Sequence, residues 1–194
     1  MRVAVNGVKI WFDVEGAGLV PDGEAMRKKP TLIALHGGPG ADHSIYKPQF
    51  SAFADVAQVV YLDHRGNGRS DQAGPETWNL AQWGDDVRAF CEALGIEKPV
   101  VYGASFGGFV AQAYATRHPD HVGKLILAST AARFDFDAMI AAFGRIGGDE
   151  AREAAADYWL NPTVPSRRRY AEICVPLYSA DLRGEPDWIT RLIQ

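Results

Sequence analysis

Short apolar runs alternate along the chain with glycine-rich loops and with helical patterns. Residues 3–14 repeat apolar and polar positions with a period of two around Asn6-Gly7, which is typical of a β-hairpin. Four continuous apolar runs follow, in "TLIALHGGPG", "VAQVVYLD", "PVVYGASFGG" and "KLILAST". Continuous apolar strands indicate a parallel sheet that is covered on both faces. We therefore predict a mostly parallel sheet with an N-terminal antiparallel hairpin.

Helical patterns lie between these runs. In residues 80–94 one apolar stripe recurs at helical spacing, formed by Leu80, Trp83, Val87, Phe90, Cys91 and Leu94. Residues 109–117 predict a second helix that ends near His118, since a residue before proline favours extended backbone. The polar segment 21–30 is expected to be a loop. Strand and helix in alternation predict an α/β fold with helices on both faces of the sheet, whose ligands bind at the carboxyl ends of the strands.

The pattern of hydrophobic and polar residues changes from Phe134 onward. Residues 134–194 are helix-prone with glycine and proline interruptions and contain no convincing strand. We expect a core in residues 1–133 and an incomplete helical cap, or lid, in residues 134–194. The three consecutive arginines from Arg167 to Arg169 are interpreted as a solvated helix face.

Composition narrows the class of protein. The 194 residues, 47% hydrophobic and 23% charged, fit one globular domain with a substantial core. A net charge of −4 offers no basic surface for nucleic acid. The first residues lack the apolar core of a signal peptide, and no run is long enough to span a membrane, so we expect a cytoplasmic protein without a membrane partner. Cys91 and Cys174 are read as reduced thiols, Cys91 within the core.

One serine lies at the turn between a predicted strand and a predicted helix. Residues 103–107, "GASFG", match G-x-S-x-G directly after a strand and before a helix, the context of a nucleophile elbow with Ser105 at its apex. Small flanking residues let neighbouring backbone pass close by. The alternative is a tight turn in which Ser105 caps the helix. A dinucleotide fingerprint would need glycine at position 105, and a phosphate loop would need Gly-Lys-Ser or Gly-Lys-Thr.

A second glycine-rich loop offers backbone N–H donors, which acyl transfer needs in addition to a nucleophile. Acyl transfer requires donors for the oxyanion, and "HGGPG" at residues 36–40 follows the first long apolar run. We predict the N–H groups of Gly38 and Phe106 as the oxyanion hole and Gly37 as a substrate contact. His36 is expected to hydrogen-bond the loop backbone.

Three motifs together carry a family resemblance. "HGGPG", "DHRGNGRS" at residues 63–70 and "GASFGG" occur in this order, and residues 8–130 resemble the α/β-hydrolase superfamily, within it the proline iminopeptidase-like branch. The resemblance implies the α/β-hydrolase fold and gives the 63–70 loop a structural role. The chain departs from the branch at Phe106, where its peptidases usually carry tryptophan, and at His64, where they usually carry glutamine.

The resemblance implies a serine hydrolase that cleaves an amide or ester through an acyl-enzyme on Ser105. The favoured activity is an aminopeptidase of proline iminopeptidase type, acting on a small molecule or short peptide, with no cofactor and no metal. A carboxylesterase or lactonase and a non-catalytic hydrolase-like binding protein stay open as alternatives. A metal hydrolase is disfavoured, because no helical ligand spacing relates its three candidate ligands, His36, His43 and His64.

The rest of the triad is not apparent in these residues. His118 and His121 fall in a link that returns to the opposite end of the sheet, and Asp181 and Asp187 follow no strand-like run. The superfamily order of nucleophile, acid and histidine implies that the acid, the histidine and the C-terminal strands lie beyond residue 194, in a longer chain. The acidic residues that could bind a substrate ammonium are Asp149, Glu150, Glu153, Asp157 and Glu172.

Overall fold

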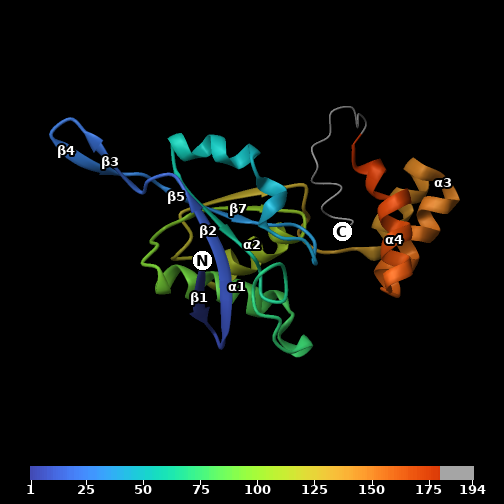
Figure 1. Ribbon diagram of the computed structural model, residues 1–194. Coiled ribbons are helices and arrows are strands. Elements are labelled where there is room, and N and C mark those ends of the chain that lie inside the picture. The colour runs from blue at the N-terminus through green and yellow to red at the C-terminus, as the bar shows by residue number, and fades with distance from the viewer. Residues whose placement is uncertain (180–194) are drawn as a thin grey trace. The chain divides into compact units, whose positions relative to one another are not determined.

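The computed structural model describes residues 1–179 (Figure 1). The chain divides into two units, Met1–Ala132 and Arg133–Gln194, and each is described by itself below.

The first unit is built on a six-stranded sheet of order β1-β2-β6-β5-β7-β8. The strands β5, β6, β7 and β8 run parallel, while β1 and β2 are antiparallel. Their bounds are β1 Arg2–Val5, β2 Val8–Glu15, β5 Thr31–Leu35, β6 Gln58–Leu62, β7 Val100–Ala104 and β8 Lys124–Ala128. The predicted hairpin is confirmed: Val5 pairs with Val8 across a turn in which Asn6 and Gly7 have positive φ.

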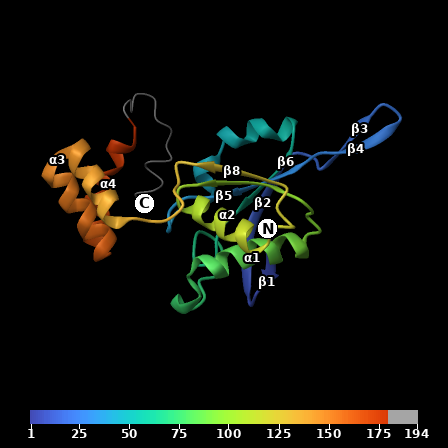
Figure 2. The ribbon, with the colours of Figure 1, turned by 180° about the vertical axis from the view of Figure 1, so that it is seen from behind.

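The prediction of a loop at residues 21–30 is wrong. A second hairpin forms there from β3 (Leu19–Asp22) and β4 (Ala25–Lys28), turning at Gly23 with φ of +62°. It extends away from the six-stranded sheet (Figures 1 and 2). Seven of its eight strand residues are exposed, and so the sequence shows no apolar alternation there.

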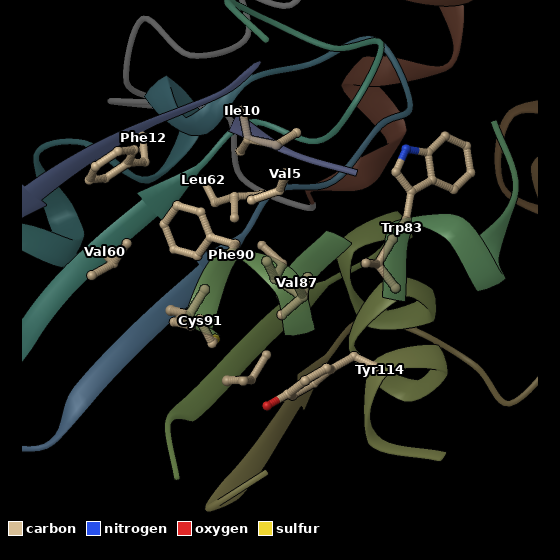
Figure 3. Close-up of a cluster of buried hydrophobic side chains, with 14 of the residues drawn as sticks. Val5, Ile10, Phe12, Val60, Leu62, Trp83, Val87, Phe90, Cys91 and Tyr114 are labelled. Carbon is tan, nitrogen blue, oxygen red and sulfur yellow. The ribbon is translucent and has the colours of Figure 1, made fainter. Parts of the chain in front are cut away.

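Two helices cover one face of the sheet, α1 (Leu80–Ala93) and α2 (Phe106–Arg117). From α1, Val87, Phe90 and Cys91 are at most 1% exposed and pack on the strands (Figure 3). The predicted stripe is wrong at its two ends, because Leu80 and Leu94 are about 40% exposed. The second helix begins three residues earlier than predicted, since its first turn contains two glycines that are weak helix formers.

The 3₁₀ helices η1 (His43–Tyr46) and η2 (Gln49–Asp55) pack on the opposite face. The Tyr46 hydroxyl donates to the Leu35 carbonyl at 2.7 Å, at the end of β5. The Tyr46 ring also lies edge-on to that of Tyr102. The end of β5 is therefore held from this face by the segment that follows it.

The apolar strand β8 is more exposed than its sequence predicts. Leu125, Ile126 and Leu127 are 36–46% exposed, because β8 is the edge of the sheet among the described residues.

The second unit is helical over its described residues, as predicted. Helix α3 (Phe136–Leu160) is interrupted at Gly148, whose φ is +76°. Helix α4 (Val164–Ile173) and η4 (Val175–Tyr178) complete a small core around Phe143, Tyr170 and Cys174. Residues 180–194, with Asp181 and Asp187, lie outside the described part. None of the helices in residues 1–179 combines the length and the apolar character needed to cross a membrane.

The predictions for the two cysteines hold, and that of a solvated arginine run holds for two of its three residues. Cys91 and Cys174 are free and buried, and burial raises the pKa of their thiols to about 12 and about 11. Arg167 and Arg168 are exposed, while Arg169 pairs with Asp157 and Glu153.

A buried ion pair joins the loop after β6 to α1. Arg65 donates to both carboxylate oxygens of Asp86, at 2.7 and 2.8 Å, and the two side chains are 3% and 6% exposed. Asn6 and Gln82 also donate to Asp86, and Arg65 donates to the Asn6 carbonyl. The pair therefore ties the loop, the helix and the first hairpin turn together.

We expect Asp86→Ala to lower the free energy of unfolding by about 3–5 kcal/mol, because it leaves the Arg65 guanidinium buried without its partner. Urea denaturation would measure this. Asp85→Ala is the matched control: Asp85 is the preceding helix residue but pairs with Arg117 at the surface, where the loss is much smaller. Equal losses for the two variants would contradict the role of the buried pair.

Candidate active site

Ser105 occupies a strained corner between β7 and α2. Its backbone has φ of 50° and ψ of −119°, a conformation that costs about 1–3 kcal/mol in a residue other than glycine. Its N–H donates to the Ala128 carbonyl at 3.0 Å, and its carbonyl accepts from Gly108 and Thr130. The residue is exposed, and its hydroxyl makes no hydrogen bond with a described residue.

The glycines around the corner are required by close backbone contacts. A Cβ on Gly103 would lie 2.3 Å from the Gly107 oxygen, and one on Gly107 would lie 2.0 Å from the Leu35 oxygen. No side chain fits at these distances. The capping alternative is wrong, because Ser105 holds the N-cap position but its side chain makes no capping hydrogen bond.

The 36–40 loop lies directly against this corner. A Cβ on Gly37 would be 3.5 Å from both the Ser105 Cβ and the Ala104 oxygen. The N–H groups of Gly38 and Phe106 enter no hydrogen bond between described residues, and Phe106 begins α2, where an N–H has no partner within the helix. The oxyanion-hole role of Gly38 and Phe106 and the substrate contact of Gly37 stay predictions.

Two buried histidines join this loop to the 63–70 loop. The His64 backbone N–H donates to His36 Nε2 at 3.1 Å, so His36 carries its proton on Nδ1, which donates to the Gly37 carbonyl at 2.7 Å. His64 Nε2 donates in turn to the His36 carbonyl at 3.2 Å. Burial lowers the pKa of both imidazoles, that of His64 most strongly. His36 thus binds the loop backbone, as predicted.

Asp63 at the end of β6 is a second junction between the loops. It accepts hydrogen bonds from the His43 N–H, the His43 ring and the Arg69 N–H, at 2.8–2.9 Å. Burial opposes its ionisation, but these hydrogen bonds outweigh burial and hold its pKa below the ordinary value. Ser70 donates to its carbonyl. Through these contacts Asp63, Arg69 and Ser70 stabilise the conformation of the 63–70 loop.

The three histidines of the disfavoured metal-hydrolase alternative do not form one ligand set, although the ring centroids of His36 and His64 lie 4.4 Å apart. Among residues 1–179 only Asp42, His43 and Asp63 place three ligand atoms within 4.8 Å of one another. Those carboxylates already accept backbone N–H groups, while His36 and His64 bind one another and the backbone.

His118 and His121 lie at the far end of α2, about 18 Å of helix away from Ser105. His118 pairs with Asp85, and His121 contacts the Tyr114 hydroxyl. Neither reaches the candidate nucleophile, as predicted.

Sequence reasoning missed Asn67. Its Oδ1 accepts from the Gly40 N–H at 2.6 Å, and its Nδ2 donates to the Arg65 carbonyl at 2.9 Å. The only signal in the sequence is an amide side chain between two glycines of a predicted loop.

The sequence matches the family described as "alpha/beta hydrolase fold" over residues 30–159. This match covers more than half of the chain. The chain therefore belongs to the α/β-hydrolase family.

Individual relatives have different named activities. RutD of Caulobacter sp. (strain K31), a protein named for carbamate hydrolysis, is 35% identical over 103 residues, 53% of this chain. Proline iminopeptidase PfmaB of Pestalotiopsis fici is 35% identical over 132 residues, 66% of this chain. A solved structure described as Est816, an N-acyl homoserine lactone degrading enzyme, is 26% identical over 100% of this chain, with a TM-score of 0.70.

The chain spans only part of these proteins. It covers 38% of RutD, 43% of PfmaB and 64% of the solved Est816 chain. The homologues are hydrolases with different named activities.

The histidine pair predicts acid sensitivity. Unfolding lets His36 and His64 bind protons at their ordinary pKa of 6.5, whereas their folded pKa values are lower. The free energy of unfolding should therefore fall as the pH drops below about 6.5, by up to about 1.4 kcal/mol per pH unit for each histidine. Urea denaturation between pH 7.5 and 4.5 would measure it.

His64→Gln is the matched variant, because glutamine cannot gain a proton in this range but keeps an N–H donor. It should have a shallower pH slope than the unaltered protein. Hydrogen bonds lower the pKa of Asp63 in the folded state, and because both proteins carry Asp63, its contribution to the pH slope cancels in the comparison. An identical slope in the variant would show that His64 is not a source of the effect.

Proposed function

We propose that this protein is a serine hydrolase that cleaves an amide or ester through an acyl-enzyme on Ser105. The observation that carries the proposal is the exposed hydroxyl of Ser105 at a strained corner, beside two backbone N–H groups without partners among the described residues. A hydroxyl so placed can approach a carbonyl carbon while N–H donors face the oxygen.

The reaction runs in two steps. The Ser105 Oγ attacks the carbonyl carbon and gives its proton to a base, and the carbonyl oxygen becomes an oxyanion that accepts from Gly38 and Phe106 N–H groups. The oxyanion collapses, the bond to the leaving group breaks, and the leaving amine or alcohol takes the proton from the base. Water then hydrolyses the ester on Ser105 by the same sequence, releasing the acid and the free hydroxyl.

A histidine base and an acid complete the proposed mechanism. No histidine in residues 1–179 hydrogen-bonds the Ser105 hydroxyl. The family resemblance implies the order nucleophile, acid, histidine, which places both groups after Ser105 in the chain.

For the substrate we propose an N-terminal residue, proline foremost, cleaved from a peptide or arylamide. The motif order and the similarity to proline iminopeptidase PfmaB support this. An aminopeptidase must also bind the substrate's ammonium. In the second unit Asp149, Glu150 and Glu172 are exposed carboxylates, whereas Glu153 and Asp157 already pair with Arg169.

A second candidate is an esterase or lactonase. It is favoured by the whole-chain similarity to the lactone-degrading Est816 and by Phe106 at the position where the branch's peptidases usually carry tryptophan. The elbow and the 36–40 loop would serve an ester carbonyl equally well. A binding protein without catalysis is the remaining alternative, and it predicts no reaction at Ser105.

A fluorophosphonate probe should label Ser105 in the full-length protein, because it reacts with activated serines, and mass spectrometry of the labelled peptide would identify the site. Ser105→Ala should lose the label and reduce kcat/KM by about 10³-fold or more. Ser129→Ala is the matched control, since Ser129 is also exposed with a positive φ of 46° but begins no helix. Absence of label on folded protein would favour the binding protein.

Substrate preference separates peptidase from esterase. If the aminopeptidase assignment holds, kcat/KM for a proline arylamide should exceed that for a p-nitrophenyl butyrate ester, because only the first carries the ammonium that the proposed site binds. N-acetylation of the proline should abolish this advantage. Faster turnover of the ester, unaffected by an ammonium, would favour the esterase or lactonase.

A further inference from the structure

The contacts of Asn67 point to a task beyond loop structure. Its side chain spans two loops: Oδ1 accepts from the Gly40 N–H at 2.6 Å, and Nδ2 donates to the Arg65 carbonyl at 2.9 Å. Asn67 is only 5% exposed. Both of its polar atoms therefore have one specific partner each.

The orientation of this amide group is fixed by chemistry. A flipped amide would set its NH₂ group against the Gly40 N–H and its oxygen against the Arg65 carbonyl, which are two repulsive contacts. The Asn67 backbone is held as well, because its N–H donates to the His64 carbonyl and its own carbonyl accepts from Ser70. The acceptor for the Gly40 N–H is thus rigidly placed.

Gly40 is mechanically coupled to Gly38. Both have positive φ, +95° and +124°, and a Cβ on Gly38 would lie 2.9 Å from the Gly40 nitrogen. Only Pro39 separates Gly38 from Gly40, so a shift of the Gly40 nitrogen is passed along the tightly curled backbone to the Gly38 peptide. The direction of the Gly38 N–H therefore depends on what holds Gly40.

The other anchors of the loop lie on either side of this point. His36 is joined to His64 before the two glycines, and the His43 N–H binds Asp63 after them. Among the described residues, only Asn67 donates to or accepts from the segment between these anchors through a side chain from another loop.

We propose that Asn67 is a positioning residue, which holds the Gly40 N–H so that the Gly38 N–H faces the oxyanion formed at Ser105. This rests on the proposed function. Asn67 does not touch the reacting atoms. Asn67 acts through the Gly40 peptide. By placing the Gly38 N–H it stabilises the charged tetrahedral intermediate rather than the bound substrate.

Asn67→Ala should lower kcat by about 10- to 100-fold with KM changed less than threefold, because a misplaced donor acts on the transition state. The assay uses the full-length protein and whichever of the proline arylamide and the butyrate ester it hydrolyses faster. Affinity for an aryl trifluoromethyl ketone, which forms a tetrahedral oxyanion adduct with serine, should fall by a similar factor. A merely structural role would lower the melting temperature without this split.

Two further variants keep the result interpretable. Asn67→Ser retains a small polar side chain in case alanine prevents folding, and its hydroxyl is too short to reach Gly40, so the same loss of kcat is expected. Asn79→Ala is the matched control, because Asn79 also accepts a backbone N–H, that of Gln82 at the start of α1, while its side chain donates to Glu76 rather than to the 36–40 loop. It should leave kcat unchanged.

The outcomes separate the two proposals. A folded Asn67 variant with kcat within twofold of the unaltered protein, in a protein where Ser105→Ala is inactive, overturns the positioning role alone. Full activity of Ser105→Ala overturns the proposed function and with it the positioning role. A joint loss of kcat and of ketone affinity supports the positioning of the Gly38 N–H.

Discussion

Among the described residues, the closest approach of backbone to a glycine is between the end of β5 and the first turn of α2. A Cβ on Gly107 would lie 2.0 Å from the Leu35 oxygen, so the two backbones meet where only glycine fits. The contact lies where β5 ends and α2 begins. Ser105, two residues before Gly107, has its strained conformation at this corner, and the loop that follows Leu35 lies beside its side chain.

The polar loop after β6 supports this arrangement from outside. Asp63, His64 and Asn67 bind the segment 36–43, and Arg65 binds Asp86 of α1. Buried polar groups of this kind stabilise only when every partner is in place. The backbone strain at Ser105 is therefore offset by a network of hydrogen bonds. Replacing one side chain of this network leaves other buried groups without partners.

The sequence predicts those parts of the fold that have local signals. Asn6-Gly7, the apolar runs and the G-x-S-x-G motif each indicate their element without reference to the rest of the chain. The β3–β4 hairpin could not be found this way, because nearly all of its strand residues are exposed and no apolar period marks them. The bond between Gly40 and Asn67 joins residues 27 positions apart, so no local pattern could predict it, although both loops were singled out.

The first hairpin has a consequence for how the chain folds. Asn6 binds Asp86, 80 residues later, and Asp86 in turn holds Arg65. Contacts of such long range form slowly, because the entropy of closing a large loop is lost before the contact compensates for it. The loop after β6, which Arg65 ties to this contact, should thus be among the last regions of a newly made chain to reach its final shape, after the N-terminal turn has docked on the helix.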